Sequence, residues 1–78
     1  MPESGVQLFH TEGCHLCEQA EGLLQSIQVA YEATEICAQP EWVERYGIRI
    51  PVIRRPDGQE LGWPFDLSQL KAFLEEAV

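Results

Sequence analysis

Two cysteines separated by two residues, Cys14 and Cys17, are the part of this sequence best suited to covalent chemistry. An apolar run typical of a buried strand, 6–9, precedes them, and a run with helical spacing follows. The first turn of a helix offers free backbone N–H groups and the positive end of the helix dipole, which stabilise a thiolate. A thiolate attacks disulfides, and a neighbouring second thiol can displace what the first has captured. We therefore interpret Cys14 as the attacking sulfur and Cys17 as the resolving sulfur.

The apolar pattern along the chain predicts the elements that position these sulfurs. In order, we expect a strand at 6–9, a helix at 14–28, a strand at 31–37, a short helix from 40 to 46, a strand at 48–54, a strand starting at 60 and a helix at 67–77. The apolar sides of the three helices comprise Leu16, Ala20, Leu23, Leu24 and Ile27; Trp42, Val43 and Tyr46; and Leu67, Leu70, Phe73, Leu74 and Ala77.

Local signals support these boundaries. Pro40 suits the first position of the short helix, 56–59 has the composition of a turn, and Asp66 with Gln69 forms the pattern of a capping box. The first two strands, joined by a helical crossover, should be parallel, and the last two should form a hairpin. We therefore expect one α/β domain, 1–78, of order β-α-β-α-β-β-α, with a four-stranded mixed sheet and helices on both faces.

The net charge of −8 is large for 78 residues, and it is unevenly distributed. Residues 1–44 contain no Lys or Arg, whereas Arg45, Arg49, Arg54 and Arg55 follow within one segment. Phosphate binding needs a broad basic face, so we expect no nucleic-acid partner. The arginines either pair with neighbouring acids or form a local site for carboxylates, because guanidinium groups present a planar fork.

Neither a membrane span nor a targeting segment is expected. No apolar run reaches the roughly 20 residues that a membrane span needs, and residues 1–5 lack the basic and apolar regions of a signal peptide. We therefore expect no membrane partner and a cytoplasmic location. Thiols stay reduced in the cytoplasm, so a paired Cys-x-x-Cys there is more often catalytic or metal-binding than structural.

Over nearly its whole length, the sequence resembles the glutaredoxin branch of the thioredoxin-like superfamily. The resemblance rests on Cys14-x-x-Cys17 at the first strand–helix junction, on Ile50-Pro51-Val52, and on a hairpin followed by a terminal helix. The chain is most similar to small bacterial glutaredoxin-like proteins with His-Leu between the cysteines and a Trp-Pro-Phe-Asp element, here 63–66. This resemblance implies a thioredoxin/glutaredoxin-like fold and a redox-active disulfide.

The resemblance also implies a substrate groove. It places a cis bond between Ile50 and Pro51 beside the cysteines, where the backbone of Ile50 would pair with an incoming peptide or thiol tripeptide. The alternative is a proline that merely opens an edge strand. Glutaredoxins carry a Gly-Gly-Xaa-Asp turn that holds glutathione, and here 62–66 replaces it. Trp63 and Phe65 would narrow or cover the groove, and Asp66 either meets an amino group or only caps its helix.

The surroundings of the cysteines depart from the family pattern as well. Typical members carry a Lys before the active-site turn, where this chain has His10 and Glu12, so we expect the Cys14 thiolate to be less stabilised than usual. His15 should point outward, and it either stabilises the thiolate as a cation or is simply a solvated turn residue. Cys37 is expected as a small buried hydrophobe, with a sensing thiol or a metal ligand as alternatives.

The function that we expect is that of a thiol–disulfide oxidoreductase using the Cys14/Cys17 couple. It would act as a monomer on protein or glutathione mixed disulfides, with no bound cofactor and with glutathione as a candidate co-substrate. The candidate substrate-binding residues are His15, Arg49, Ile50, Pro51, Trp63 and Asp66.

Two alternatives come from different classes. In the first, Cys14 and Cys17 bind zinc together with one or two of His10, His15 and Cys37, although a second closely spaced ligand pair is missing from the sequence. The resemblance to glutaredoxins adds an iron–sulfur cluster bridging two subunits as a related option. In the second, the chain is an interaction module without redox activity, whose 63–65 loop and acidic half dock a basic partner.

Overall fold

The computed structural model describes residues 5–75, and its elements follow the predicted order. They are β1 (Gln7–His10), α1 (His15–Ser26), β2 (Glu32–Glu35), the 3-10 helix η1 (Ile36–Ala38), α2 (Pro40–Tyr46), β3 (Val52–Arg54), β4 (Glu60–Gly62) and α3 (Leu67–Glu75). The β-α-β-α-β-β-α order is confirmed, and η1 is an addition to it. Ala77, which we expected on the last helix, lies outside the described residues, as do residues 1–4.

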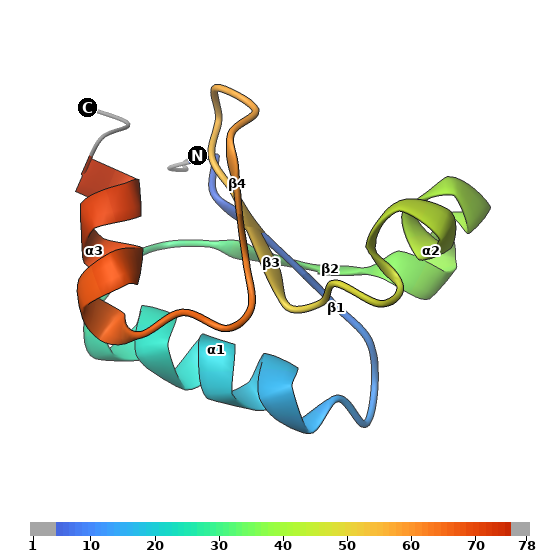
Figure 1. Ribbon diagram of the computed structural model, residues 1–78, viewed down its shortest axis with the longest axis horizontal. Coiled ribbons are helices and arrows are strands. Elements are labelled where there is room, and N and C mark those ends of the chain that lie inside the picture. Colours follow the sequence, from blue (N-terminus) through green and yellow to red (C-terminus); the bar gives the residue numbers. More distant parts are fainter. Residues whose placement is uncertain (1–4, 76–78) are drawn as a thin grey trace.

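A four-stranded mixed sheet with the order β2-β1-β3-β4 forms the centre of the fold (Figure 1). β1 is parallel to β2 and antiparallel to β3, and β3 and β4 form an antiparallel hairpin. His10 lies opposite Glu35, and Phe9 lies opposite Val52. The ends of β1 and β2 and the start of β3 therefore meet at one edge of the sheet.

Apolar residues cover both faces of this sheet, because neighbouring side chains of a strand point to opposite sides. Leu8 and Ile53 pack with residues of α1 and α3 on one face. Phe9 and Val52 pack with Tyr46 of α2 on the other face, where the rings of Phe9 and Tyr46 stack at 4.2 Å. Helices on both faces of the sheet, as predicted, are confirmed. None of the helices within residues 5–75 is long and apolar enough to cross a membrane.

The second strand ends earlier than the sequence predicted. We expected it to run over 31–37, but it stops at Glu35, whose carboxylate accepts the N–H of Cys37 at 3.0 Å and turns the chain into η1. Ile36 takes the buried position in this turn, and Cys37 is exposed. The prediction that Cys37 is a buried hydrophobe is therefore wrong.

The third strand begins later than predicted, at Val52 instead of residue 48. The intervening chain stays folded against the end of α2, because the N–H groups of Arg49 and Ile50 both donate to the carbonyl of Tyr46, at 2.8 and 3.0 Å. Ile48 is fully exposed on this turn. Turn hydrogen bonds have thus replaced the strand pairing that the apolar run suggested.

The buried stripes of two helices also differ from the prediction. Leu16 is 41% exposed, and the buried positions of α1 are Cys17, Ala20 and Leu24. The stripe is therefore displaced by one residue at the start of the helix, where Cys17 takes the buried position expected for Leu16. In α2, Val43 is likewise exposed.

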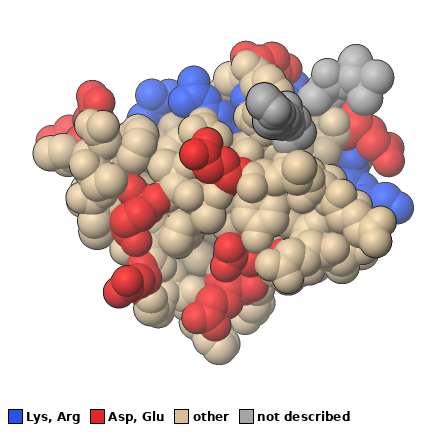
Figure 2. Space-filling view, turned by 180° about the vertical axis from the view of Figure 1, so that it is seen from behind, with Lys and Arg blue, Asp and Glu red and all other residues tan. Residues whose placement is uncertain are grey.

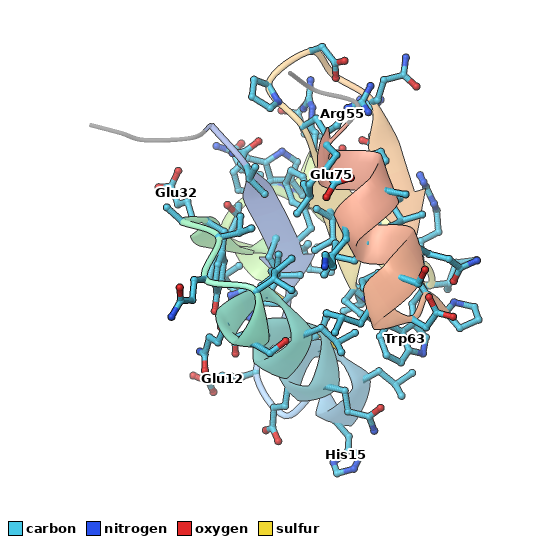
Figure 3. The ribbon with its side chains drawn as sticks, turned by 90° about the vertical axis from the view of Figure 1, so that its left-hand side faces the viewer. Glu12, His15, Glu32, Arg55, Trp63 and Glu75 are labelled. Atoms are coloured by element: carbon cyan, nitrogen blue, oxygen red, sulfur yellow. A yellow bond between two sulfur atoms is a disulfide. The ribbon has the colours of Figure 1, made fainter. Side chains whose placement is uncertain are left out.

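Arg55 ties the β3–β4 hairpin to the end of α3 (Figure 3). It is only 8% exposed, and its guanidinium donates to both carboxylate oxygens of Asp57, at 3.1 and 2.7 Å, and to the carbonyl of Phe73 at 2.8 Å. The same group lies 4.7 Å from the centroid of the Phe73 ring. A cation at this position satisfies one of the carbonyls that a helix C-terminus leaves unpaired.

We expect Arg55→Ala to lower the free energy of unfolding by about 2–3 kcal/mol, because it removes a buried charged donor that bonds to Asp57 and to the carbonyl of Phe73. Urea denaturation measures this change. The matched control is Arg54→Ala, since Arg54 is half-buried on the opposite face of the sheet; that change should cost less than about 1 kcal/mol. Equal losses in the two variants would contradict this role of Arg55.

The Arg55–Asp57 pair also predicts a dependence on pH. Hydrogen bonds from Arg55, followed by the N–H of Gln59, lower the pKa of Asp57 from its usual 3.8. Because the folded-state pKa is the lower one, this stabilisation is fully present above pH 3.8 and is lost as the pH falls through the folded-state pKa. Wild type should therefore melt at a higher temperature than Asp57→Asn at neutral pH, and the difference should shrink towards about pH 2. A constant difference would contradict it.

Candidate functional site

Cys14 and Cys17 form a disulfide at the start of α1, with Cα atoms 5.2 Å apart. Cys14 is the N-cap of the helix, and its Sγ accepts the N–H of Cys17 at 3.1 Å. The turn that precedes it includes Gly13 at φ +76°, a conformation that glycine adopts readily. The sulfur of Cys14 therefore occupies the position in which a serine or aspartate oxygen commonly caps a helix.

The two sulfurs differ in their access to solvent. Cys17 is 3% exposed and lies on the buried side of α1, whereas Cys14 is only partly buried. An external disulfide can therefore reach Cys14 more easily than Cys17. This difference fits the roles that we predicted, with Cys14 as the attacking sulfur and Cys17 as the resolving sulfur.

The turn before Cys14 is fixed to the neighbouring strand through Glu35. One carboxylate oxygen of Glu35 accepts the N–H of Glu12 at 3.1 Å, and the other accepts the N–H of Cys37. The N–H of Cys37, the hydroxyl of Thr11 and the N–H of Glu12 together hold the pKa of Glu35 below its usual range. Thr11 also lies 3.5 Å from the sulfur of Cys37. The exposed side chain of Cys37 therefore contacts the turn that precedes Cys14.

The peptide bond between Ile50 and Pro51 is cis, which confirms that prediction. Pro51 is buried, and it directly precedes Val52, the residue opposite Phe9 near the end of β1. The cis bond and the turn that carries Cys14 therefore lie at the same edge of the sheet. The backbone of half-buried Ile50 leads into this edge.

Trp63 adjoins the cis-proline. Its backbone N–H donates to the carbonyl of Pro51 at 3.1 Å. Its ring meets that of Phe65 edge to face, with the ring centroids 5.0 Å apart. The bond between Trp63 and Pro64 is also cis, which the sequence did not lead us to expect. Trp63 therefore lies at the edge that holds Pro51. Phe65 is only 5% exposed and packs in the core, so the expectation that it covers a groove is wrong.

Asp66 and Gln69 form the predicted capping box. The N–H of Asp66 donates to the side chain of Gln69 at 2.9 Å, and the N–H of Gln69 donates to the carboxylate of Asp66 at 2.8 Å. Of the two roles considered for Asp66, the structure therefore contains the helix cap.

Arg49 is directed towards Glu60. Its Nη2 donates to one oxygen of that carboxylate at 3.3 Å, and the hydroxyl of Tyr46 donates to the other at 2.6 Å. Burial acts to raise the pKa of Glu60, but these two hydrogen bonds outweigh it and hold the pKa below its usual range. The Arg49 side chain is 45% exposed. Its contacts lie at the start of β4, away from the Gly62 end that adjoins the cis-proline.

The two histidines differ in their exposure to solvent. His15 is exposed and points away from both Glu12 and Trp63 (Figure 3), as expected of a residue between the cysteines. His10 is partly buried at the end of β1. Among residues 5–75, no group of three or more His, Cys, Asp or Glu side chains is placed to hold a metal ion.

Acidic side chains are scattered over the face of the molecule shown in Figure 2, while basic ones lie at its edges. Arg55 and Arg49 both pair with carboxylates of the chain, in line with the first of the two interpretations of the arginine segment, pairing with neighbouring acids.

Glu35 is the site residue that the sequence analysis missed. Nothing in its local pattern distinguishes it from other strand glutamates, and only the pairing of His10 with Glu35 brings it to the turn.

Comparisons with known proteins agree with this geometry. Residues 5–75 match the family described as glutaredoxin-like domain (DUF836). The X-ray and solution structures of the target protein XcR50 from X. campestris are each 39% identical to this chain with TM-scores of 0.86. The X-ray match covers 94% of this chain and 99% of that one, and the solution match covers 95% and 96%.

A more distant match is the holo form of glutaredoxin C1 from Populus tremula x tremuloides. It is 16% identical, with a TM-score of 0.65, over 96% of this chain and 87% of that one, and it shows the fold alone. No curated protein matches the sequence. The resemblance and the glutaredoxin-like fold are thereby confirmed, and the chain belongs to the glutaredoxin-like domain (DUF836) family.

Proposed function

We propose that this protein is a thiol–disulfide oxidoreductase whose Cys14 and Cys17 cycle between dithiol and disulfide. The observation that supports this most is the disulfide at the start of α1, in which the partly exposed sulfur also accepts a helix N–H. A purely structural disulfide would have no need of an accessible sulfur at a helix terminus. The family to which the chain belongs is consistent with the same chemistry.

The reaction runs in two exchanges. In the reduced protein, the Cys14 thiolate attacks one sulfur of the substrate disulfide, and the other substrate sulfur leaves as a thiolate and takes up a proton. Cys17 then loses its proton and attacks the sulfur of Cys14. This step releases the second substrate thiol and forms the Cys14–Cys17 disulfide seen here. Two electrons have passed to the substrate, and two external thiols or one dithiol reductant must return them.

Geometry favours the Cys14 thiolate, whereas the surrounding charge opposes it. The N–H of Cys17 and the helix dipole stabilise negative charge on the sulfur. Glu12 and Glu18 place negative charges near the same turn, and they oppose a negative charge on the sulfur. Residues 1–44 contain no lysine or arginine that could offset them. We therefore propose that the Cys14 thiolate is stabilised less here than in glutaredoxins that have a lysine before the turn.

The substrates that we propose are protein disulfides and glutathione mixed disulfides in the cytoplasm. The cis bond before Val52 places Ile50 at the sheet edge, where its carbonyl can accept a hydrogen bond from an extended segment. The N–H of Ile50 donates to the carbonyl of Tyr46. Trp63 beside Pro51 would form the wall of this groove. Because Asp66 caps its own helix, we assign recognition of the substrate amino group a smaller part than in glutaredoxins.

His15 and Arg49 complete the proposed substrate contacts, and each would meet a different part of the substrate. His15 is exposed beside the sulfurs and can contact whatever approaches Cys14. The partly exposed guanidinium of Arg49 can meet a substrate carboxylate, although it must share its charge with Glu60.

Cys14→Ser should abolish reduction of both insulin and a glutathione mixed disulfide, because it removes the attacking sulfur. Cys17→Ser should stop at the mixed disulfide, so that turnover requires an external thiol. Cys37→Ser removes the other thiol and serves as the matched control, which should retain activity. Persistent activity of Cys14→Ser would show that the nucleophile is assigned wrongly.

Limited alkylation tests the difference in access between the sulfurs. In the fully reduced protein, brief treatment with iodoacetamide should modify Cys14 and exposed Cys37 well before Cys17, by a factor of about ten or more. Peptide mass spectrometry assigns each modification, and a denatured sample gives the reference rates. Equal rates for Cys14 and Cys17 in the native protein would speak against their assigned roles.

A further inference from the structure

We propose that Glu35 is a positioning residue for Cys14: its carboxylate anchors the turn that presents the attacking sulfur to the start of α1. This inference rests on the proposed function, because it assigns Glu35 a part in preparing the same nucleophile. The family match and the sequence motifs do not assign Glu35 any role.

The sheet places Glu35 where it can act on this turn. β1 and β2 are parallel and end together, with His10 opposite Glu35. The chain leaves β1 into the turn 11–14 and leaves β2 into η1, so both departing segments start beside the same carboxylate. Its Oε1 accepts the N–H of Glu12 at 3.1 Å, and its Oε2 accepts the N–H of Cys37 at 3.0 Å.

A short series of hydrogen bonds connects this anchor to the sulfur. Glu12 is adjacent to Thr11, whose carbonyl accepts the N–H of Cys14 at 3.3 Å. Cys14 in turn presents its Sγ to the N–H of Cys17 at 3.1 Å. The position of the sulfur on the helix N–H therefore depends on a turn that is fastened to β2 by the Glu35 carboxylate.

Charge alone would give Glu35 the opposite effect. Its hydrogen bonds keep it ionised at neutral pH, with a pKa below the usual range. A carboxylate near Cys14 disfavours the thiolate by like-charge repulsion. Positioning and repulsion thus predict opposite signs when Glu35 is removed, which makes the proposal testable by direction as well as by size.

The test compares Glu35→Ala, Glu35→Gln and the matched control Glu32→Ala. Glu32 is an exposed glutamate at the other end of the same strand, and Figure 3 shows its side chain far from Glu12. In the reduced proteins, the rate of Cys14 alkylation by iodoacetamide is measured across pH. Peptide mass spectrometry separates Cys14 from Cys37, and thermal unfolding is recorded for every variant.

Glu35→Ala should slow Cys14 alkylation at pH 7 by about threefold or more and move the midpoint of its pH profile upward, since the sulfur is held less often on the helix N–H. Glu35→Gln offers one acceptor in place of two, so it should also be slower than wild type, but less so. If Glu35→Ala does not fold, Glu35→Gln decides alone. Glu32→Ala should match wild type.

The proposal is overturned if either Glu35 variant alkylates as fast as wild type or faster, which would leave only charge repulsion. A lower melting temperature with an unchanged pH midpoint would also overturn it, because Glu35 would then be merely structural. Alkylation involves no disulfide substrate, so these outcomes are independent of the proposed function. Failure of that function would instead appear as turnover by Cys14→Ser.

Discussion

The pairing of β1 with a parallel strand on one side and an antiparallel strand on the other determines the site. Because β1 and β2 end where β3 begins, one edge of the sheet collects the cysteine turn, the Glu35 carboxylate and the cis Ile50–Pro51 bond. The hairpin register then adds Trp63 through its bond to the carbonyl of Pro51. Residues far apart in the sequence, such as Phe9 and Val52, thus become neighbours without any long loop.

The parts of this arrangement that could be predicted are those with local causes. The Cys-x-x-Cys spacing, the period of the apolar residues and the capping box of Asp66 act within one turn or one element. They were sufficient for the element order, the mixed sheet and helices on both of its faces. The cis bond came from the resemblance, since the residues around Pro51 alone also allow a proline that simply opens a strand.

The errors have non-local causes. The apolar run 48–53 looks like one strand, but hydrogen bonds from the N–H groups of Arg49 and Ile50 to the carbonyl of Tyr46 hold its first half in a turn. Cys37 looks like the end of a buried strand, but the carboxylate of Glu35 turns the chain and gives the buried position to Ile36. Glu35 has the same local pattern as Glu32, and only its place opposite the end of β1 separates them. Such differences depend on which strands pair, which periodicity does not encode.

If Cys14 acts as proposed, its thiolate needs stabilising partners, and the two arginines whose ion pairs are described do not supply them. Arg49 is shared with Glu60, and Arg55 is buried between the hairpin and α3, so neither is placed by its contacts to serve Cys14. Two sources that do act at Cys14 are the helix dipole and the N–H of Cys17, whose effects fall off within the first turn. A short-range source requires an accurately held sulfur. If Glu35 acts as proposed, its hold on the turn before Cys14 would keep the sulfur on these short-range donors. An acidic residue would then support a thiolate by fixing its position even while its charge opposes it.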